Sequence, residues 1–318
     1  MRLRWLLLAA IGSALAFVGW AWQRDMRLLQ ARLQADATIV ETAFGPVAHA
    51  EGGQGAPVLV IHGAGGGHDQ GALLARAFLP EGYRWIAPSR FGYPGSAMPA
   101  DASTAAQADA LAEMLDGLGI PRVTLLAMSG GVPPALQFAR RHPARTQALI
   151  LLSLAPYAPL TAEDQELPVP LWLYDALFAT DLPLWAVLRL SPRALAPIFD
   201  ARPELIARMT EAEGRFLDAM IAAFLPVTGR RAGLANEGAA IAPAAAIDPG
   251  LIAVPALIVH ARDDRITPVA TAQFTATGIP GAETVIFDSG GHLLLGHHAA
   301  VRARIAGFLA AHAPPEAE

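Results

Sequence analysis

The sequence contains no cysteine among its 318 residues. Disulfide bonds, thiolate catalysis and cysteine-ligated metal sites are therefore excluded, and the redox compartment stays open. Charged residues are also scarce, at 16% of the chain, and the formal net charge is -5. No basic face of the kind that binds nucleic acid is indicated, so we expect no nucleic-acid partner. Metal-ligand spacings such as H-E-x-x-H are absent as well, and we expect neither a metal nor a cofactor.

The N-terminus, in contrast, holds one long apolar run. Arg2 and Arg4 precede an uncharged stretch from Trp5 to Trp22. Its length suits a bilayer-spanning helix, and its terminal tryptophans suit the membrane interfaces, so we expect residues 1–33 to form an anchor and stalk in contact with membrane lipid. The segment Ala14-Leu15-Ala16 resembles a signal-peptide cleavage site, and removal of the segment is the alternative. Arginines flank the run on both sides, so the positive-inside rule does not decide its orientation.

Beyond the anchor, strand patterns alternate with helical ones. Apolar runs typical of buried strands occur at 57–61, 123–128, 148–152 and 254–260. This alternation predicts an α/β fold with a mostly parallel sheet covered on both faces. The alternation stops between 155 and 249, which we interpret as a helical lid over the sheet's C-terminal edge. We therefore expect two parts of one core, at 34–154 and 250–312, with a lid between them at 155–249 and a disordered tail at 313–318.

One of these strands ends at a single serine between small residues. Ala127 and Gly131 stand two positions before and after Ser129, as a nucleophile elbow requires where strand and helix backbones pass close together. In such an elbow Ser129 Oγ is exposed at the strand end, and the amide of Gly130 points to where an oxyanion would form. Taken alone, the pattern, with alanine in the first glycine place, indicates no more than an ordinary Ser-Gly-Gly turn.

A glycine-rich segment, His62-Gly63-Ala64-Gly65-Gly66-Gly67-His68, follows the apolar run at 57–61. A glycine-rich turn after a strand can hold phosphates. No Lys-Ser/Thr follows here, however, and His68 takes the place of the third glycine of a G-x-G-x-x-G motif. The segment therefore does not indicate nucleotide binding.

Parallel strands bring their C-terminal ends to one edge of a sheet. We therefore expect four parts of the chain to meet at this edge: the segment at His62, Ser129, and the loops with Asp264 and His292. A serine hydroxyl is a weak nucleophile and needs a base such as His292 to take its proton. The base in turn needs a carboxylate such as Asp264 to hold its tautomer and stabilise the imidazolium. The order serine, acid, histidine is that of the α/β-hydrolases.

From about Thr38 to Ala311 the chain resembles the α/β-hydrolase superfamily, within its lid-bearing group of esterases, perhydrolases and C–C hydrolases. The resemblance rests on His62-Gly63-Ala64-Gly65, Phe91-Gly92-Tyr93-Pro94-Gly95-Ser96, the Ser129 elbow, Asp264 and Gly291-His292. It implies a triad of Ser129, Asp264 and His292 and an oxyanion hole formed by the amides of Ala64 and Gly130. Supporting positions are His62, Gly63, Gly65 and Gly131.

Neighbouring residues offer alternatives to two triad members. Asp264 is preferred to Asp263 because the family's acid lies four residues before a proline, here Pro268, and we expect Asp263 to cap a turn. His292 is preferred to His297 and His298, which fall at the start of a helix and are expected to be solvated or capping. His62 is expected to orient the oxyanion loop and not to transfer protons.

The sequence therefore predicts a membrane-anchored serine hydrolase that cleaves carboxylic esters of apolar small molecules through an acyl-enzyme. Carbon–carbon bond or peroxy-acid chemistry on the same triad is one alternative, and a non-catalytic ligand-binding protein that kept the fold is another. A serine in place of an aspartate nucleophile argues against dehalogenase and epoxide hydrolase activity.

Overall fold

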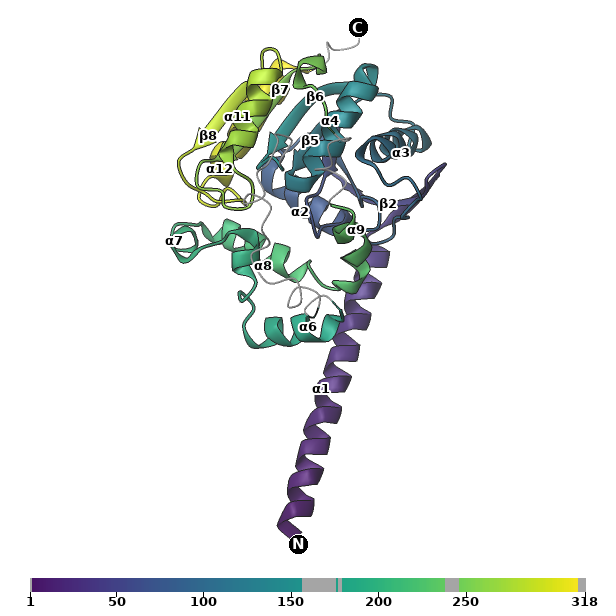
Figure 1. Ribbon diagram of the computed structural model, residues 1–318, viewed down its shortest axis with the longest axis vertical. Helices are drawn as coiled ribbons and strands as arrows, with labels where there is room; N and C mark the ends of the chain where they lie inside the picture. Colours follow the sequence, from purple (N-terminus) through teal and green to yellow (C-terminus); the bar gives the residue numbers. More distant parts are fainter. Residues whose placement is uncertain (1, 156–175, 177–178, 238–245, 314–318) are drawn as a thin grey trace.

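An eight-stranded sheet forms the centre of the computed structural model, which describes residues 2–155, 176, 179–237 and 246–313 (Figure 1). The strand order is β1-β2-β4-β3-β5-β6-β7-β8. The strands are β1 (Thr38–Thr42), β2 (Gly45–Gly52), β3 (Ala56–Ile61), β4 (Tyr83–Pro88), β5 (Val123–Met128), β6 (Thr146–Leu152), β7 (Ala256–Ala261) and β8 (Glu283–Phe287). Strand β2 pairs antiparallel with β1 and β4, and every other pairing is parallel. The predicted α/β fold with a mostly parallel sheet is confirmed.

Helices cover both faces of this sheet. Buried side chains of α2 (His68–Phe78) and α12 (His298–Ala311) pack on one face. Those of α3 (Thr104–Gly117), α4 (Val132–Arg141) and α11 (Val269–Gly278) pack on the other. Alternate residues of β3 enter the two cores, Val58 and Val60 on one side and Leu59 and Ile61 on the other, as strand geometry requires.

Helix α2 begins at His68, although the helical pattern of the sequence is clear only from about Ala72. The glycine that obscured this start, Gly71, has a packing role inside the helix. A Cβ on Gly71 would lie only 2.8 Å from Ala87 Cβ, so glycine lets α2 approach β4 closely.

All the secondary-structure elements that the structure describes between β6 and β7 are helices, joined by turns and irregular segments. Its elements are α6 (Asp181–Leu190), η4 (Ala196–Phe199), α7 (Pro203–Ile206), α8 (Glu211–Ala222), η5 (Thr228–Arg230), α9 (Arg231–Ala235) and η7 (Pro249–Leu251). The sequence at 203–224 has an amphipathic helical pattern throughout, but the structure divides it, because Thr210 and Glu213 form a capping box that starts α8 anew. Most of 155–178, part of 238–249 and nearly all of the tail 313–318 lie outside the described residues.

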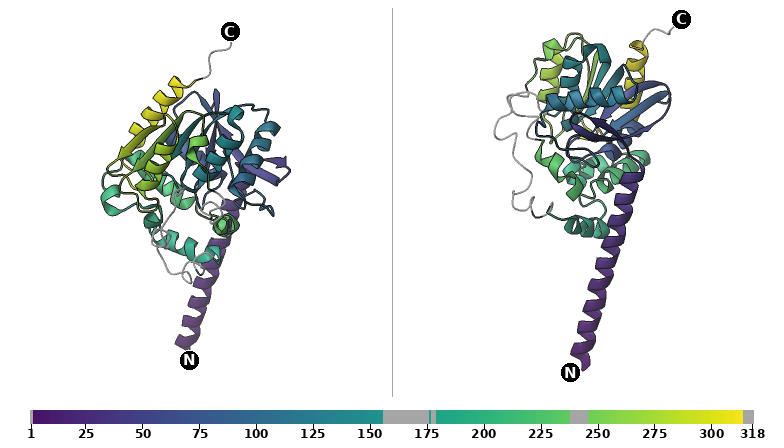
Figure 2. Two further views of the ribbon diagram at one scale, coloured as in Figure 1. Left: turned by 45° about the horizontal axis from the view of Figure 1, so that its top comes forward. Right: turned by 90° about the vertical axis from the view of Figure 1, so that its right-hand side faces the viewer.

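The N-terminal segment forms one continuous helix, α1 (Arg2–Ala35), whose first part extends away from the rest of the molecule (Figures 1 and 2). It is long and apolar enough to cross a membrane. By length and composition it fits a membrane anchor or a signal sequence.

Candidate active site

The serine at the end of β5 lies in a sharp turn that leads into α4. Ser129 begins η1 (Ser129–Gly131), and its φ of 53° is in the left-handed region, which costs a non-glycine residue about 1–3 kcal/mol. Such strain is typical of a nucleophile elbow. Gly131 is small for a steric reason, because a Cβ there would lie 2.5 Å from Ile61 O and 2.6 Å from His62 O.

The loop after β3 lies directly against this turn. A Cβ on Gly63 would be 3.0 Å from Ser129 Cβ. The amide nitrogen of Ala64 lies 3.2 Å from the position that a Cβ on Gly130 would take, and Gly65 has a φ of 71° that only glycine adopts readily. The structure thus brings together the two segments expected to supply the oxyanion amides.

His62 is fully buried behind this loop. Its Nε2 accepts a hydrogen bond from the amide of Arg90 at 3.0 Å, and its Nδ1 donates to Gly63 O at 2.7 Å. Burial, with the charge of Arg90 in addition, holds the pKa of His62 well below its ordinary value, so the ring is neutral. These contacts fix the first residues of the oxyanion loop.

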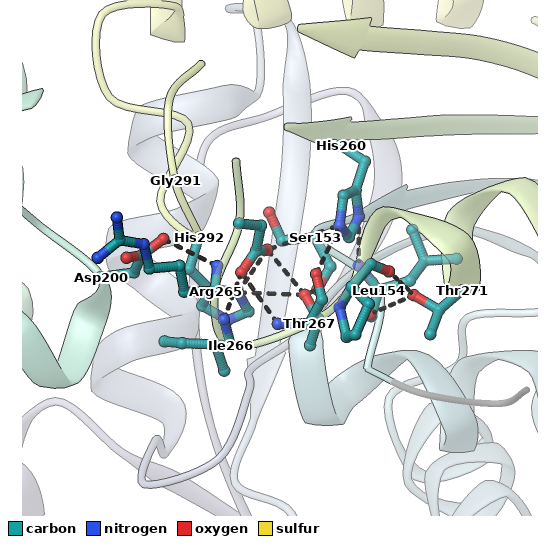
Figure 3. Close-up of polar contacts among 12 residues, drawn as sticks. Ser153, Leu154, Asp200, His260, Arg265, Ile266, Thr267, Thr271, Gly291 and His292 are labelled. Atoms are coloured by element: carbon teal, nitrogen blue, oxygen red, sulfur yellow. Dashed lines mark hydrogen bonds and ion pairs between the residues drawn. The ribbon is translucent and has the colours of Figure 1, made fainter. Parts of the chain in front are cut away.

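The loops after β7 and β8 place a histidine against a carboxylate. His292 Nδ1 lies 2.9 Å from Asp264 Oδ2, and both side chains are buried. Asp264 accepts three further hydrogen bonds, from the amides of Ile266 and Thr267 at 2.9 and 3.0 Å and from Thr267 Oγ1 at 2.7 Å (Figure 3). Within the described part of the chain, no hydrogen bond joins His292 to Ser129. Catalytic hydrogen bonds often tighten only when substrate is bound.

These donors keep the carboxylate ionised. Burial alone would raise the pKa of Asp264, but the charge of His292 and the hydrogen bonds from His292 and Thr267 hold it well below its ordinary value. Burial likewise would lower the pKa of His292, but the charges of Asp264 and Asp200 and the hydrogen bond to Asp264 raise it above the ordinary value. The pair is therefore arranged to stabilise an imidazolium.

Two neighbouring residues differ from their expected roles. Asp263 does not simply cap a turn: its Oδ1 accepts from the amide of Gly291 at 2.9 Å, and its Oδ2 accepts from Arg202 Nη2 at 2.5 Å. Asp263 thereby ties the loop before His292 to the region between β6 and β7. His298 is not solvated, because its ring is buried and contacts Leu293 O at 2.9 Å.

A buried network missed by the sequence analysis links the oxyanion loop to the residues after α9. Glu237 pairs with Arg90 through two hydrogen bonds, of 2.9 and 3.0 Å, and accepts a third from Tyr93. Tyr93 Oη in turn accepts from the amide of Gly65 at 3.0 Å. Burial, with the charge of Glu237 in addition, raises the pKa of Tyr93 well above its ordinary value, so the phenol remains a donor.

A second link joins the same loop to η5. Arg230, whose side chain is completely buried, donates to Gly66 O and to both carboxylate oxygens of Asp69, at 3.2 and 2.7 Å. A third side chain from this region, Asp200, lies beside the loop of His292, and its Oδ2 accepts from the amide of Arg265 at 3.1 Å (Figure 3). The region between β6 and β7 thus contacts both halves of the site.

The glycine at position 130 is the local feature that accommodates this network. A Cβ on Gly130 would lie 2.7 Å from Glu237 Oε2 and 3.3 Å from Arg90 Nη1, so the missing side chain at Gly130 makes room for the ion pair. Among the described residues, no group of three or more His, Asp or Glu side chains could hold a metal ion.

Comparison with known proteins places this site in a family. Residues 56–299 match the family described as alpha/beta hydrolase fold, and the chain belongs to it. It is 30% identical over 277 residues to the uncharacterized hydrolase YcgS of Bacillus subtilis (strain 168), covering 81% of this chain and 92% of that protein. It is 31% identical over 259 residues to a 2-hydroxymuconate semialdehyde hydrolase of Pseudomonas putida, covering 80% and 86%.

Among solved structures, an alpha/beta hydrolase fold protein from Nakamurella multipartita is similar with a TM-score of 0.74 and 27% identity, over 86% of this chain and 98% of that one. Family and fold together make the chain an α/β-fold hydrolase, which implies a small-molecule substrate. The fold by itself does not identify that substrate.

Proposed function

We propose that the chain is a membrane-anchored serine hydrolase that cleaves carboxylic esters of apolar small molecules. The observation that carries the proposal is the buried pair of His292 and Asp264, set on loops at the same sheet edge as the strained Ser129. In this arrangement Asp264 holds the proton on His292 Nδ1, which leaves Nε2 free to accept a proton.

The proposed reaction runs through an acyl-enzyme. His292 Nε2 takes the hydroxyl proton of Ser129 while Oγ attacks the ester carbonyl carbon, and the resulting oxyanion is bound by the amides of Ala64 and Gly130. Collapse of this tetrahedral species breaks the bond to the alcohol, which leaves with the proton from His292. Water, deprotonated by His292, then attacks the acyl carbon and releases the acid and Ser129.

Two features of the chain support the anchor and the apolar substrate. Helix α1 exposes large apolar side chains from Leu3 to Trp20, which a bilayer would cover. The proposed lid, residues 155–249, contributes Phe199 and Phe224 to the apolar core, and a Cβ on Gly65 of the oxyanion loop would meet the Phe224 ring at 2.3 Å. An apolar surface therefore borders the oxyanion loop on the lid side.

The test is activity-based labelling of membranes that carry the full-length chain, after an alkaline carbonate wash. A fluorophosphonate probe should label the protein in the membrane pellet, and Ser129→Ala should abolish the label. Ser153→Ala is the matched control, because Ser153 is also buried at a strand end with a positive φ, of 43°, and should leave labelling intact. Equal labelling of wild type and Ser129→Ala would refute the nucleophile, and label in the supernatant would refute the anchor.

Hydrolysis of a carbon–carbon bond is the second candidate, favoured by the similarity to the 2-hydroxymuconate semialdehyde hydrolase. The same serine, histidine and aspartate would serve it. Turnover of a 2-hydroxy-6-oxo-dienoic acid by the purified protein, with no turnover of p-nitrophenyl butyrate, would select this candidate over the esterase.

A further inference from the structure

Helix α1 consists of two parts with different surroundings. From Leu3 to Trp20 its large apolar side chains are 44–70% exposed. From Ala21 onward the helix packs against the rest of the molecule, with Ala21 and Met26 buried and Trp22 and Leu29 against the core. The free part spans about 28 Å, close to the thickness of a bilayer's hydrocarbon core, about 30 Å. If α1 is the anchor, the membrane surface lies near residue 20.

Helix α6 lies at this level. Trp185 Nε1 donates to Asp25 Oδ2 at 3.0 Å, and Arg189 Nε lies 3.6 Å from the same oxygen. Asp25 follows Trp20 by about 8 Å along the helix axis. In the views of Figures 1 and 2, α6 lies beside α1 at the end of the globular part nearest the free N-terminal stretch.

Among the described residues, two leucines of α6 do not pack against the apolar core. Leu190 is 88% exposed and Leu182 is 41% exposed, whereas Leu184 and Trp185 are buried and Ala186 is partly buried against the core. Leu182, Ala186, Arg189 and Leu190 follow the i, i+4, i+7, i+8 spacing of a single helix face. The guanidinium of Arg189 lies over the Trp185 ring, 5.9 Å from its centroid. Exposed leucines beside an arginine are typical of helices that lie in a membrane interface.

We propose that the face of α6 that carries Leu182 and Leu190 lies in the interface of the bilayer that holds α1, and that the enzyme takes its substrate, a lipid acyl ester, from that bilayer. This inference rests on the proposed anchor and esterase function and names the source and class of the substrate.

A chain of contacts connects α6 with the oxyanion loop. Asp181, the first residue of α6, accepts from the amide of Thr228 at 2.9 Å and from Thr228 Oγ1 at 2.6 Å. Thr228 begins η5, which ends at Arg230, the side chain that binds Gly66 O and Asp69. A lid helix that is seated in the membrane therefore holds the oxyanion loop in a fixed relation to the bilayer.

The absence of cysteine allows a direct test on the full-length protein. Single variants Leu8→Cys, Leu190→Cys and Leu251→Cys are labelled with the fluorophore NBD and reconstituted in vesicles of phosphatidylcholine and phosphatidylglycerol. Leu251 is the matched control, because it is 56% exposed and adjoins Gly250, which lines a cavity with His312 near the C-terminal end. Nitroxide lipids should quench the label at Leu8 and at Leu190, the latter best with a shallow nitroxide, and aqueous iodide should quench the label at Leu251.

The outcomes distinguish the membrane contact of α6 from the membrane anchor α1. If Leu190→Cys behaves like Leu251→Cys while Leu8→Cys is quenched by lipid, α6 does not contact the bilayer but α1 is still the anchor. If Leu8→Cys is also not quenched by lipid, α1 is not an anchor, and the proposed membrane contact of α6 is refuted as well.

Activity provides the second readout. Leu190→Glu should lower kcat/KM about tenfold for 4-methylumbelliferyl oleate dissolved in the vesicles, because one apolar side chain leaves the interface. It should leave the hydrolysis of soluble p-nitrophenyl butyrate unchanged, and Leu251→Glu should affect neither substrate. An equal loss on both substrates, or no loss on the oleate, would overturn the proposal.

Discussion

The two halves of the candidate site are held by different kinds of contacts. Asp264 receives hydrogen bonds from Ile266 and Thr267, its near neighbours in sequence, as well as from His292. The oxyanion loop is held instead by side chains from outside it, Tyr93 and, 164 residues from its contact at Gly66, Arg230. The acid–base half is thus built mostly within its own loops, whereas the oxyanion half depends on the region between β6 and β7.

This difference implies that a substitution can impair one half of the site and leave the other intact. Removing a donor or acceptor at Asp264 changes the proton transfer by His292 but leaves the contacts of the region between β6 and β7 unchanged. Removing Glu237 or Arg230 changes the support of the oxyanion loop while the His292–Asp264 pair stays intact. Variants of each kind should therefore have distinct kinetic signatures.

The largest effect is expected from Asp264→Asn. An asparagine can donate to His292 Nδ1, which favours the tautomer that has its proton on Nε2 and cannot accept one from Ser129. We expect kcat to fall by about 10⁴-fold, with KM little changed. Steady-state kinetics with p-nitrophenyl butyrate measures this.

Asp263→Asn is the matched control for that variant. Its side chain binds Gly291 and Arg202 but not the imidazole of His292, so the loss should be about tenfold at most. The opposite ranking of the two variants would show that Asp263, not Asp264, is the acid.

Much of the fold could be predicted from the sequence, because buried strands in a parallel sheet are apolar over their whole length. The runs at Val58–Ile61 and Leu149–Leu152 are fully buried strands for this reason. Helix limits were harder where glycine serves packing, as at Gly71, or where a capping box divides a helical stretch, as at Thr210. Both features oppose or interrupt the periodicity on which sequence prediction depends.

The positions at the strand ends could also be anticipated, since small residues around Ser129 and the spacing of Asp264 from Pro268 are local features. Glu237, Arg230 and Asp200 could not. Their partners lie far away in sequence, 147 residues in the case of Arg90 and Glu237, and a single charged residue in a helical region predicts a solvated side chain. Only the folded chain brings them to the loops.

A smaller effect is expected from Glu237→Gln, which tests the other half of the site. The substitution keeps the shape but leaves Arg90, only 4% exposed, without its counter-ion. We expect a loss of about 2 kcal/mol in unfolding free energy and a fall in kcat of about tenfold, because the oxyanion loop loses part of its support. Denaturant unfolding and steady-state kinetics measure the two quantities.

Glu51→Gln is the control for this variant. Glu51 also pairs with an arginine, Arg84 at 2.7 Å, but both side chains are more than a third exposed, and such pairs contribute about 0–1 kcal/mol. Equal effects of the two variants would show that Glu237 does not support the oxyanion loop, and that the two halves of the site do not differ in the way they are held.

The smallest effect concerns Asp200, a carboxylate from the region between β6 and β7 that acts on the acid–base half. Its charge is among the causes that raise the pKa of His292 above 6.5, and His292 must be neutral to take the proton of Ser129. Activity therefore falls as the pH drops through the raised pKa. Asp200→Asn removes a negative charge and lowers that pKa, so the variant should be more active than wild type, relative to each protein's maximum, on the acid side of the kcat/KM profile. Asp218→Asn, which breaks a different lid ion pair with Arg193, should leave the profile unmoved. An acid limb that shifts equally in both variants, or in neither, would show that the lid contributes nothing to the charge at His292.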